Sequence, residues 1–393
     1  MQTAMLIVLL FLAAVVLLPI AVFAAECLAA VLPARKPKLS QGARPRVAVL
    51  VPAHNEESGI AATIADILPQ LGEGDRLIVV ADNCSDGTAA VARSAGAAVI
   101  ERTDPERRGK GYALDFGVRH LQENSPPEVV VVIDADCRLL PGTLDVLARE
   151  AVGRGLPVQG LDLLDPPDSP RLRDRISAFA FLVKNKVRPL GLSRLGIPCL
   201  LTGTGMALPW QSVQRVSLAS GHIVEDTKLA VDLAIGGHPA VFCPEGGVTG
   251  TLAAGSAALV QRRRWEHGSL LVQFTQLPRL FREAVRQRRP GLLAMALDLT
   301  VPPLSLLVIA WVVVTALTGA IWLARGPVLP LYLMIAGGAC LAGAVLVAWA
   351  RHARKVLPLR YLLAAPLYAA WKIPLYLGFL IRRETSWVRT PRP

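Results

Sequence analysis

The sequence is poor in charged residues and has no paired cysteines. Only 18% of its 393 residues are charged and 53% are hydrophobic, a balance unlike that of an ordinary soluble protein. The 6 cysteines are scattered without a C-x-x-C pair or metal-ligand spacing, unlike a disulfide framework or a zinc site, so we expect reduced thiols in a cytosolic compartment. Neither a G-x-x-x-x-G-K-[ST] loop nor a G-x-G-x-x-G fingerprint is present. A nucleotide, if bound, is therefore held by a different binding motif.

The net charge of +12 is concentrated at the C-terminal end of the chain. Residues 262–393 hold 18 Lys/Arg against 4 Asp/Glu, whereas residues 1–261 hold 24 against 26. The longest apolar runs lie in the same basic third, so we expect its arginines to face anionic lipid headgroups rather than nucleic-acid phosphates. The charge pattern predicts membrane lipids as partners and no nucleic acid.

Three charge-free runs are long enough to cross a hydrocarbon core of about 30 Å as helices. The first is Met5–Ala25, which lacks the basic start of a signal peptide and is followed by basic residues; its N-terminus should face outward and the chain should then enter the cytoplasm. Leu299–Ala324 and Gly326–Ala350 are separated only by Arg325 at a Gly-Pro turn, which predicts a helical hairpin.

Further segments are expected at the membrane surface. Tyr361–Ile381 contains two prolines and several aromatic residues, which is typical of an interfacial or re-entrant segment rather than a span. Ser269–Arg289 alternates apolar and arginine positions, as an amphipathic helix on the inner leaflet does; an ordinary surface helix is the alternative. Arg262 and Arg263 are interpreted as a basic stop at the membrane surface.

Between residues 46 and 261 the apolar runs become short and alternate with helical stretches. Residues 46–52, 76–81, 97–101 and 128–134 are predicted to be buried parallel strands, because they are almost continuously apolar. This pattern predicts an α/β domain with a mostly parallel sheet, whose ligands bind beyond the carboxyl ends of the strands. The polar residues at those ends are His54, Asn55, Glu56, Glu57, Asp82, Asn83, Asp86, Asp134 and Asp136.

The strand VVVIDADC (130–137) ends in two carboxylates one residue apart. Asp134 and Asp136 can both point toward one hard cation, and Mg²⁺ or Mn²⁺ prefers such oxygen ligands, with water and substrate phosphates in its other positions. The alternative is that the two residues merely end a strand in a turn. The motif alone does not decide between these readings.

Seven motifs follow one another in a fixed order: VLVPAHNEE (49–57), VVADNCSDGTA (79–89), RRGKGYAL (107–114), DAD (134–136), LTGTGMAL (201–208), VED (224–226) and QRRRW (261–265). This set resembles glycosyltransferase family 2 over most of residues 46–265. The last motif is similar to the Q-x-x-R-W of membrane-bound cellulose, chitin and hyaluronan synthases and of ceramide glucosyltransferases. The resemblance implies a GT-A fold, a nucleotide-diphosphate sugar donor with Mn²⁺ or Mg²⁺, and inverting transfer in one displacement.

Carried over residue by residue, the resemblance makes Asp82 a nucleotide-binding carboxylate and Asp134 a contact to the nucleoside or its ribose. It makes Asp136, with Asp134, the metal ligands. Many members have two consecutive aspartates where this chain has Ala81 and Asp82, so which family carboxylate Asp82 replaces stays open. Asp86 is interpreted as a cap for the helix that starts at Gly87. The implied donor site consists of Pro52, Asn55, Glu56, Asp82, Lys110, Asp134, Gln261 and Arg264.

The implied catalytic residues are Asp226, Glu225, Arg264 and Trp265. Asp226 matches the family's base, although Val224 replaces the usual threonine; an ordinary Glu-Asp pair at a helix start is the alternative. Arg264 would approach the departing diphosphate and Trp265 would help form the acceptor site. The segment SWVRTPR (386–392) is similar to a gating segment of hyaluronan synthases; a lipid-bound basic tail is the alternative.

The sequence thus predicts a multi-pass inner-membrane or plasma-membrane glycosyltransferase with its catalytic domain in the cytoplasm. It would move a hexosyl or N-acetylhexosaminyl group from a nucleotide-diphospho-sugar, with a UDP-sugar as the expected donor, to a growing cell-surface glycan or a membrane-bound acceptor. It would act alone or with a second copy or an accessory subunit. A lipid glycosyltransferase making a single transfer is the alternative; a transporter or inactive scaffold is disfavoured because no inverted repeat is visible. The predicted divisions are 1–31 (N-terminal span), 45–261 (GT-A domain), 262–290 (interface helix) and 292–393 (C-terminal membrane region and tail).

Overall fold

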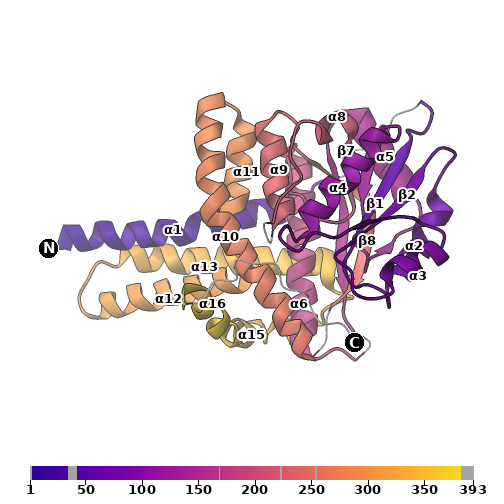
Figure 1. Cartoon of the computed structure of the whole chain (residues 1–393). Coiled ribbons are helices and arrows are strands. Elements are labelled where there is room, and N and C mark those ends of the chain that lie inside the picture. The colour runs from indigo at the N-terminus through magenta and orange to yellow at the C-terminus, as the bar shows by residue number, and fades with distance from the viewer. Residues whose placement is uncertain (1, 34–41, 168, 222–223, 253–254, 382–393) are drawn as a thin grey trace. The chain divides into compact units, whose positions relative to one another are not determined.

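Figure 1 shows the computed structural model of the chain, which describes residues 2–33, 42–167, 169–221, 224–252 and 255–381. The contacts between residues divide the chain into two compact units. The helical unit comprises Met1–Pro33, Asp168–Gly196 and Leu259–Arg383. The sheet unit comprises the described residues of 34–167 and 197–258.

The sheet unit is built on one 8-stranded mixed sheet in the order β3-β2-β1-β4-β7-β6-β8-β5. β1 pairs in parallel with β2 and β4, β2 with β3, and β6 with β8; the pairs β4–β7, β6–β7 and β5–β8 are antiparallel. The strands are β1 Val47–Ala53, β2 Arg76–Asp82, β3 Ala98–Arg102, β4 Val129–Val132, β5 Arg138–Leu139, β6 Val158–Asp165, β7 Met206–Pro209 and β8 Val241–Thr251. All four strands predicted from the sequence are present, and β4 ends two residues before its predicted end.

Helices cover both faces of this sheet because its strands are apolar on both faces. Val47, Val49 and Val51 of β1 share one buried core with the isoleucines of α2. On the opposite face, Leu50 approaches Gly117 of α4 so closely that a Cβ there would lie 3.1 Å from its side chain. Figure 1 shows α2 and α3 on one side of β1 and β2 and α4 on the other. The helices are α2 Ile60–Ile67 with the 3₁₀ turn Leu68–Gln70, α3 Thr88–Ser94, α4 Lys110–Glu123, α5 Thr143–Arg154, α8 Trp210–Val213 and α9 Glu225–Ile235.

The helical unit contains the long apolar segments. Its elements are α1 Gln2–Ala29, α6 Leu172–Leu182, the π-helical turn η2 Val183–Val187, α7 Arg188–Leu195, α10 Gly255–Gln287, α11 Pro290–Thr300, α12 Leu304–Leu323, α13 Leu329–Ala348, the π-helical turn η3 Trp349–Ala353, α14 Leu359–Leu362, α15 Ala365–Trp371 and α16 Ile373–Ile381. α1 runs along α13, and α12 lies beside both (Figure 1).

Among the described residues, four segments are long and apolar enough to cross a membrane: Gln2–Ala29, Leu304–Leu323, Leu329–Ala353 and Leu359–Phe379. The first three agree with the predicted runs, and α12 and α13 form the predicted hairpin with Arg325 at a positive φ of 65°. The predicted run from Leu299 begins too early, because Pro302 and Pro303 end α11 before α12 starts. The fourth segment consists of three short helices, and its interfacial placement stays a prediction.

The amphipathic helix expected from Ser269 begins at Gly255 and runs for 33 residues as α10, so the motif QRRRW lies inside it. Phe274, Phe281 and Val285 are exposed at helical spacing, as the interfacial interpretation requires. The interpretation of Arg262 as a membrane-surface stop is wrong. Its side chain is 3% exposed and donates a hydrogen bond to Asp174 at 2.9 Å, because it lies on the face of α10 that packs inward.

Candidate active site

The loops after β1 and β2 are joined by side chains that sequence analysis placed at the sheet edge. Asn55 adopts a positive φ of 55°, a backbone conformation that asparagine tolerates better than most residues. The backbone N–H of Ser85 donates to Asn55 Oδ1 at 2.7 Å, and that of Glu56 donates to Thr88 Oγ1 at 2.7 Å. Asp86 accepts a hydrogen bond from the Thr88 N–H, at 3.0 Å, in the first turn of α3. Asp86 thus bonds the first residue of α3, but the N-cap residue is Gly87 and the helix starts one residue later than predicted.

Asp82, the last residue of β2, is buried and paired. Its Oδ1 accepts hydrogen bonds from Arg102 at 2.6 Å and from Asn83 at 3.0 Å. Arg102 also bridges to Asp104 at 2.9 Å and lies over the ring of Tyr112. Sequence analysis missed Arg102, although it ends β3 directly beside Asp82 in the parallel register. The ion pair with Arg102 offsets part of the cost of burying Asp82 at the edge of the sheet.

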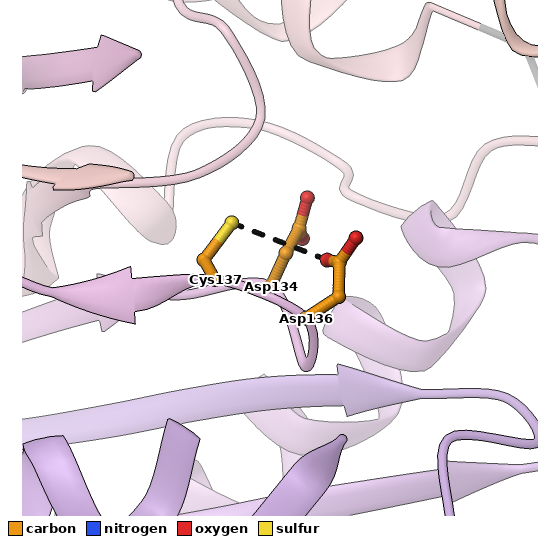
Figure 2. Close-up of side chains that lie close together, drawn as sticks. All are labelled: Asp134, Asp136 and Cys137. Atoms are coloured by element: carbon orange, nitrogen blue, oxygen red, sulfur yellow. Dashed lines mark hydrogen bonds between the residues drawn. The ribbon is translucent and has the colours of Figure 1, made fainter. Parts of the chain in front are cut away.

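Asp134 and Asp136 lie in the turn that follows β4, where the Cys137 N–H donates to the Asp134 carbonyl at 3.1 Å. Figure 2 shows both carboxylates and the Cys137 thiol on the same turn, and their ligand atoms lie within 4.8 Å of one another. Burial, followed by the charges of Asp136 and Asp134, raises the pKa of the Cys137 thiol well above its usual value. The thiol therefore keeps its proton at neutral pH, and the two carboxylates are the groups that fit a hard divalent cation.

Lys110, the first residue of α4, joins this turn to the loop before β7. Its ammonium forms an ion pair with Asp134 and donates a hydrogen bond to the carbonyl of Gly203 at 2.8 Å. The Asp134 N–H in turn donates to Thr204 Oγ1 at 3.0 Å. Burial lowers the pKa of Lys110, but the charges of Asp134 and Glu225 outweigh it and raise that pKa above the ordinary value. Lys110 therefore stays charged at this site.

Gly203 lies between Lys110 and the carboxylate of Asp226. It has a positive φ of +94°, and a Cβ there would lie 3.2 Å from Lys110 Nζ and 3.4 Å from Asp226 Oδ2. Glu225 and Asp226 form the first turn of α9, where the helix N-terminus favours negative charge. One pocket is lined by residues that include Lys110, Gly203, Glu225, Asp226, Lys228 and Asp232.

Glu225 has a raised pKa beside Asp226. Burial, followed by the charge of Asp226, raises the pKa of Glu225 from 4.5 to about 8, although Lys110 opposes the shift. Glu225 is therefore mostly protonated at neutral pH, and the pair does not carry two full negative charges. A carboxyl group whose pKa is raised by burial beside a second carboxyl group is common where one of the two acts as an acid or a base.

The structure thus brings together Lys110, Asp134, Glu225 and Asp226 in the sheet unit, with Asp136 on the same turn as Asp134. Pro52 is half-buried near the end of β1. Gln261, Arg264 and Trp265 lie on α10 in the helical unit, where the Trp265 ring packs 5.5 Å from Phe181. Their roles at the donor site stay predictions, and residues 386–392 lie outside the described residues.

Comparison with known families identifies the class of protein. The family model for glycosyl transferase family 2 matches residues 48–158, and the model for glycosyl transferase family group 2 matches residues 129–379. The chain belongs to the glycosyl transferase family group 2. It is a glycosyltransferase, which confirms the enzyme class predicted from the seven motifs.

Individual relatives match shorter stretches. An uncharacterized glycosyltransferase of Mycobacterium tuberculosis (strain ATCC 25618 / H37Rv) is 38% identical over 122 residues, 29% of this chain and 51% of that protein. The 4,4'-diaponeurosporenoate glycosyltransferase of Staphylococcus aureus (strain USA300) is 37% identical over 95 residues, 23% of this chain and 24% of that protein. The chain therefore spans about half of the length of the first relative and about a quarter of the length of the second.

A solved structure matches almost the whole chain. It is a mannosyltransferase from Pyrobaculum calidifontis in complex with GDP-Man and Mn²⁺, with a TM-score of 0.57 and 20% sequence identity. The match covers 95% of this chain and 100% of that one. At this identity the likeness shows the fold alone, and it confirms the GT-A α/β fold predicted for the sheet unit.

Proposed function

We propose that the chain is an inverting glycosyltransferase that moves a sugar from a nucleotide-diphospho-sugar, such as a UDP-sugar, to a growing cell-surface glycan or another membrane-bound acceptor. The observation that carries this proposal is the junction at Lys110. Its ammonium connects Asp134 of the β4 turn to Gly203, beside Asp226 of α9. Groups suited to a diphosphate, a metal ion and an acceptor hydroxyl are thereby joined in one continuous set of contacts.

The donor side of the proposal uses the sheet edge. Asp82, with one oxygen held by Arg102, would accept hydrogen bonds from the nucleoside, and Pro52, Asn55 and Glu56 would line the loop beside it. Asp136 and the Asp134 oxygen not paired with Lys110 would hold Mn²⁺ or Mg²⁺. When bound, such an ion neutralises charge on the departing diphosphate. Lys110 would add a fixed positive charge on the same side.

The acceptor side of the proposal uses the first turn of α9. An inverting displacement needs a base that removes the proton from the acceptor hydroxyl as its oxygen attacks the anomeric carbon. Asp226 faces the pocket, and its Oδ1 accepts the Thr227 N–H at 2.6 Å, which fixes the carboxylate. Because Glu225 holds its proton at neutral pH, we assign the base to Asp226 and a supporting role to Glu225.

The helical unit supplies the proposed membrane location. We place residues 1–31 and the membrane region of 292–393 in the inner or plasma membrane. The GT-A domain at 45–261 and the basic tail of 292–393 would lie in the cytoplasm, and the interface helix at 262–290 on the inner leaflet. Gln261 and Arg264 would reach the diphosphate and Trp265 the acceptor sugar. A second copy or an accessory subunit would complete an exit path if the product is a polymer.

A specific observation favours a second candidate, a single transfer to a lipid. The described residues contain four candidate spans, few for a polymer channel made by one chain, and the Staphylococcus aureus relative is named as a 4,4'-diaponeurosporenoate glycosyltransferase. Both candidates use the same donor chemistry. They differ in the size and solubility of the product.

One experiment tests the proposed function and separates the two candidates. Membranes that contain the protein are incubated with labelled UDP- and GDP-sugars and Mn²⁺, and the label is followed into polymer and into organic-phase lipid. We expect transfer from one donor, lost in Asp136→Asn and kept in the control Asp115→Asn, whose carboxylate makes an ion pair with Arg119 on α4. Label in long polymer supports synthesis, label confined to single-sugar lipid supports the alternative, and no transfer from any donor contradicts both.

A further inference from the structure

Four basic side chains gather where the candidate span Leu329–Ala353 ends. Arg351 and His352 belong to η3, Lys186 belongs to η2 and Arg194 belongs to α7. η3 contacts α6, the helix that continues directly into η2, so these two distant parts of the sequence lie together. The charges of Lys186, Arg351 and Arg194 all act on His352. All four lie in the helical unit. We call them the basic cluster.

Within the described part of the helical unit, no carboxylate neutralises the basic cluster. Its five described acidic residues are all paired with other basic side chains: Glu26 and Asp298 with Arg188, Asp174 with Arg262, Glu266 with Lys372, and Glu283 with Arg286. Like charges held together without a counter-charge repel one another and destabilise the fold. The arrangement therefore favours an anion supplied from outside the chain.

Two buried nitrogen atoms of the cluster have no hydrogen-bond partner among the described residues. These are Arg194 Nε and His352 Nε2. The guanidinium Nε always carries a hydrogen, so Arg194 holds a buried donor whose partner is missing. Leaving such a donor unpaired is costly, and an oxygen acceptor that arrives with negative charge would satisfy it. This points to a ligand rich in charged oxygens, such as a phosphate.

The surroundings identify the source of that phosphate. His352 lies at the end of a 25-residue apolar segment, at the depth where lipid headgroups begin if the segment spans the membrane. Ile335 and Leu346 of α13 are 52% and 48% exposed and offer an apolar surface along which acyl chains can lie. Arg354, which packs over the Trp349 ring, and Lys355 continue the positive charge beyond the span.

We propose that the basic cluster is a binding site for the phosphate of an anionic membrane phospholipid. Arg194 and Lys186 hold the phosphate from one side, and Arg351 and His352 hold it from the end of α13. The bound lipid neutralises the cluster and fixes η3 against α7 and η2. Basic pockets between membrane helices bind anionic headgroups in this way. The site is independent of the donor chemistry proposed above.

The test uses the purified full-length protein in a neutral detergent. Phosphatidylglycerol, phosphatidylcholine or inorganic phosphate is titrated in, while native mass spectrometry counts bound lipid and thermal unfolding reports stability. We expect phosphatidylglycerol to bind and raise the unfolding midpoint, and the other two to have little effect. The double variant Lys186→Gln/Arg194→Gln should bind phosphatidylglycerol about thirtyfold more weakly, equivalent to about 1 kcal/mol for each basic side chain removed.

Matched variants separate a site from a general charge effect. Arg93→Gln/Arg119→Gln removes the same charge from exposed positions on α3 and α4 of the sheet unit, and should bind like the wild type. The charge-conserving pair Lys186→Arg/Arg194→Lys should keep most of the affinity. If the double variant does not fold, the exposed Arg351→Gln replaces it, with a smaller expected loss of about fivefold.

Three results would overturn the proposal. Equal binding of phosphatidylglycerol and phosphatidylcholine would show that the cluster does not select an anionic lipid. An equal loss of phosphatidylglycerol affinity in the double variant and in its charge-matched control would show a general charge effect and no specific site. A midpoint shift with inorganic phosphate as large as with phosphatidylglycerol would show a free-phosphate site instead of a lipid site. Sugar transfer enters none of these measurements, so failure here leaves the proposed enzyme activity untouched.

Discussion

Lys110 Nζ donates a hydrogen bond to the carbonyl oxygen of Gly203 at 2.8 Å. The contact joins the start of α4 to the loop that precedes β7, 93 residues further along the chain. Asp134 binds the same ammonium from the turn after β4. Displacing the Gly203 loop would therefore disturb Lys110, Asp134 and Asp226 together.

The first prediction concerns the backbone at Gly203. Gly203→Ala should cost about 1–3 kcal/mol of stability because of its positive φ, and should also push Lys110 and Asp226 apart, because the new Cβ would lie 3.2 Å from Lys110 Nζ. Gly237→Ala is the matched control, since Gly237 has a φ of +91° and nothing within 4 Å. Unfolding measurements should show similar losses in both variants, whereas only Gly203→Ala should lose transfer. Equal transfer activities of Gly203→Ala and Gly237→Ala would show that Gly203 does not position the active site.

The second prediction concerns pH and Glu225. The folded-state pKa of Glu225 is raised from 4.5 to about 8, so folding disfavours its ionised form. This destabilisation is absent below about pH 4.5, grows as pH rises toward 8, and is then constant. Glu225→Gln cannot ionise, so its stability relative to wild type should increase across this window. Unfolding midpoints of both proteins across this pH range check the sign, and a constant difference would contradict the assigned shift.

The third prediction separates donor binding from chemistry. Asp226→Asn keeps the shape of the side chain but removes the base, so transfer should fall by about 10²- to 10⁴-fold while the nucleotide still binds. Calorimetry with UDP or GDP, run beside the transfer assay, measures both quantities. Parallel losses of nucleotide affinity and turnover would instead place Asp226 at the donor.

The fourth prediction concerns the side of the membrane. A cysteine at Arg325, in the turn of the α12–α13 hairpin, should react with an impermeant thiol reagent added to intact spheroplasts. A cysteine at Glu123, at the end of α4 in the sheet unit, should react only after the membrane is opened. The unmodified chain gives the background from its native cysteines, including the exposed Cys340. The reverse labelling pattern would show that the chain crosses the membrane in the orientation opposite to the proposed one.

The sequence was sufficient to predict the first four strands, because buried parallel strands are continuously apolar and their ends carry the polar residues. It was also sufficient to predict the apolar helices, since length and hydropathy alone define candidate spans. Arg102 was missed as the partner of Asp82, because that contact depends on the register between β2 and β3, which no local pattern encodes.

Other features depend on packing between distant segments. The burial of Arg262 follows from its contact with Asp174 in α6, 88 residues away, so a basic run beside a membrane segment gave a misleading signal. Glu225 and Asp226 were predicted to act together, but the raised pKa of Glu225 depends on its burial and on the charge of Asp226, and Lys110 from the start of α4 opposes that shift.

The most direct test of the proposed chemistry is metal-dependent sugar transfer by the purified protein. Wild type, Asp136→Asn and the control Asp115→Asn are given the nucleotide sugar identified in membranes, over a range of Mn²⁺ concentrations. We expect wild type and Asp115→Asn to show the same Mn²⁺-dependent turnover and Asp136→Asn to lose it while keeping its unfolding midpoint, because a charged metal ligand is gone. Turnover of folded Asp136→Asn near the wild-type level at limiting Mn²⁺ would contradict the proposed metal site.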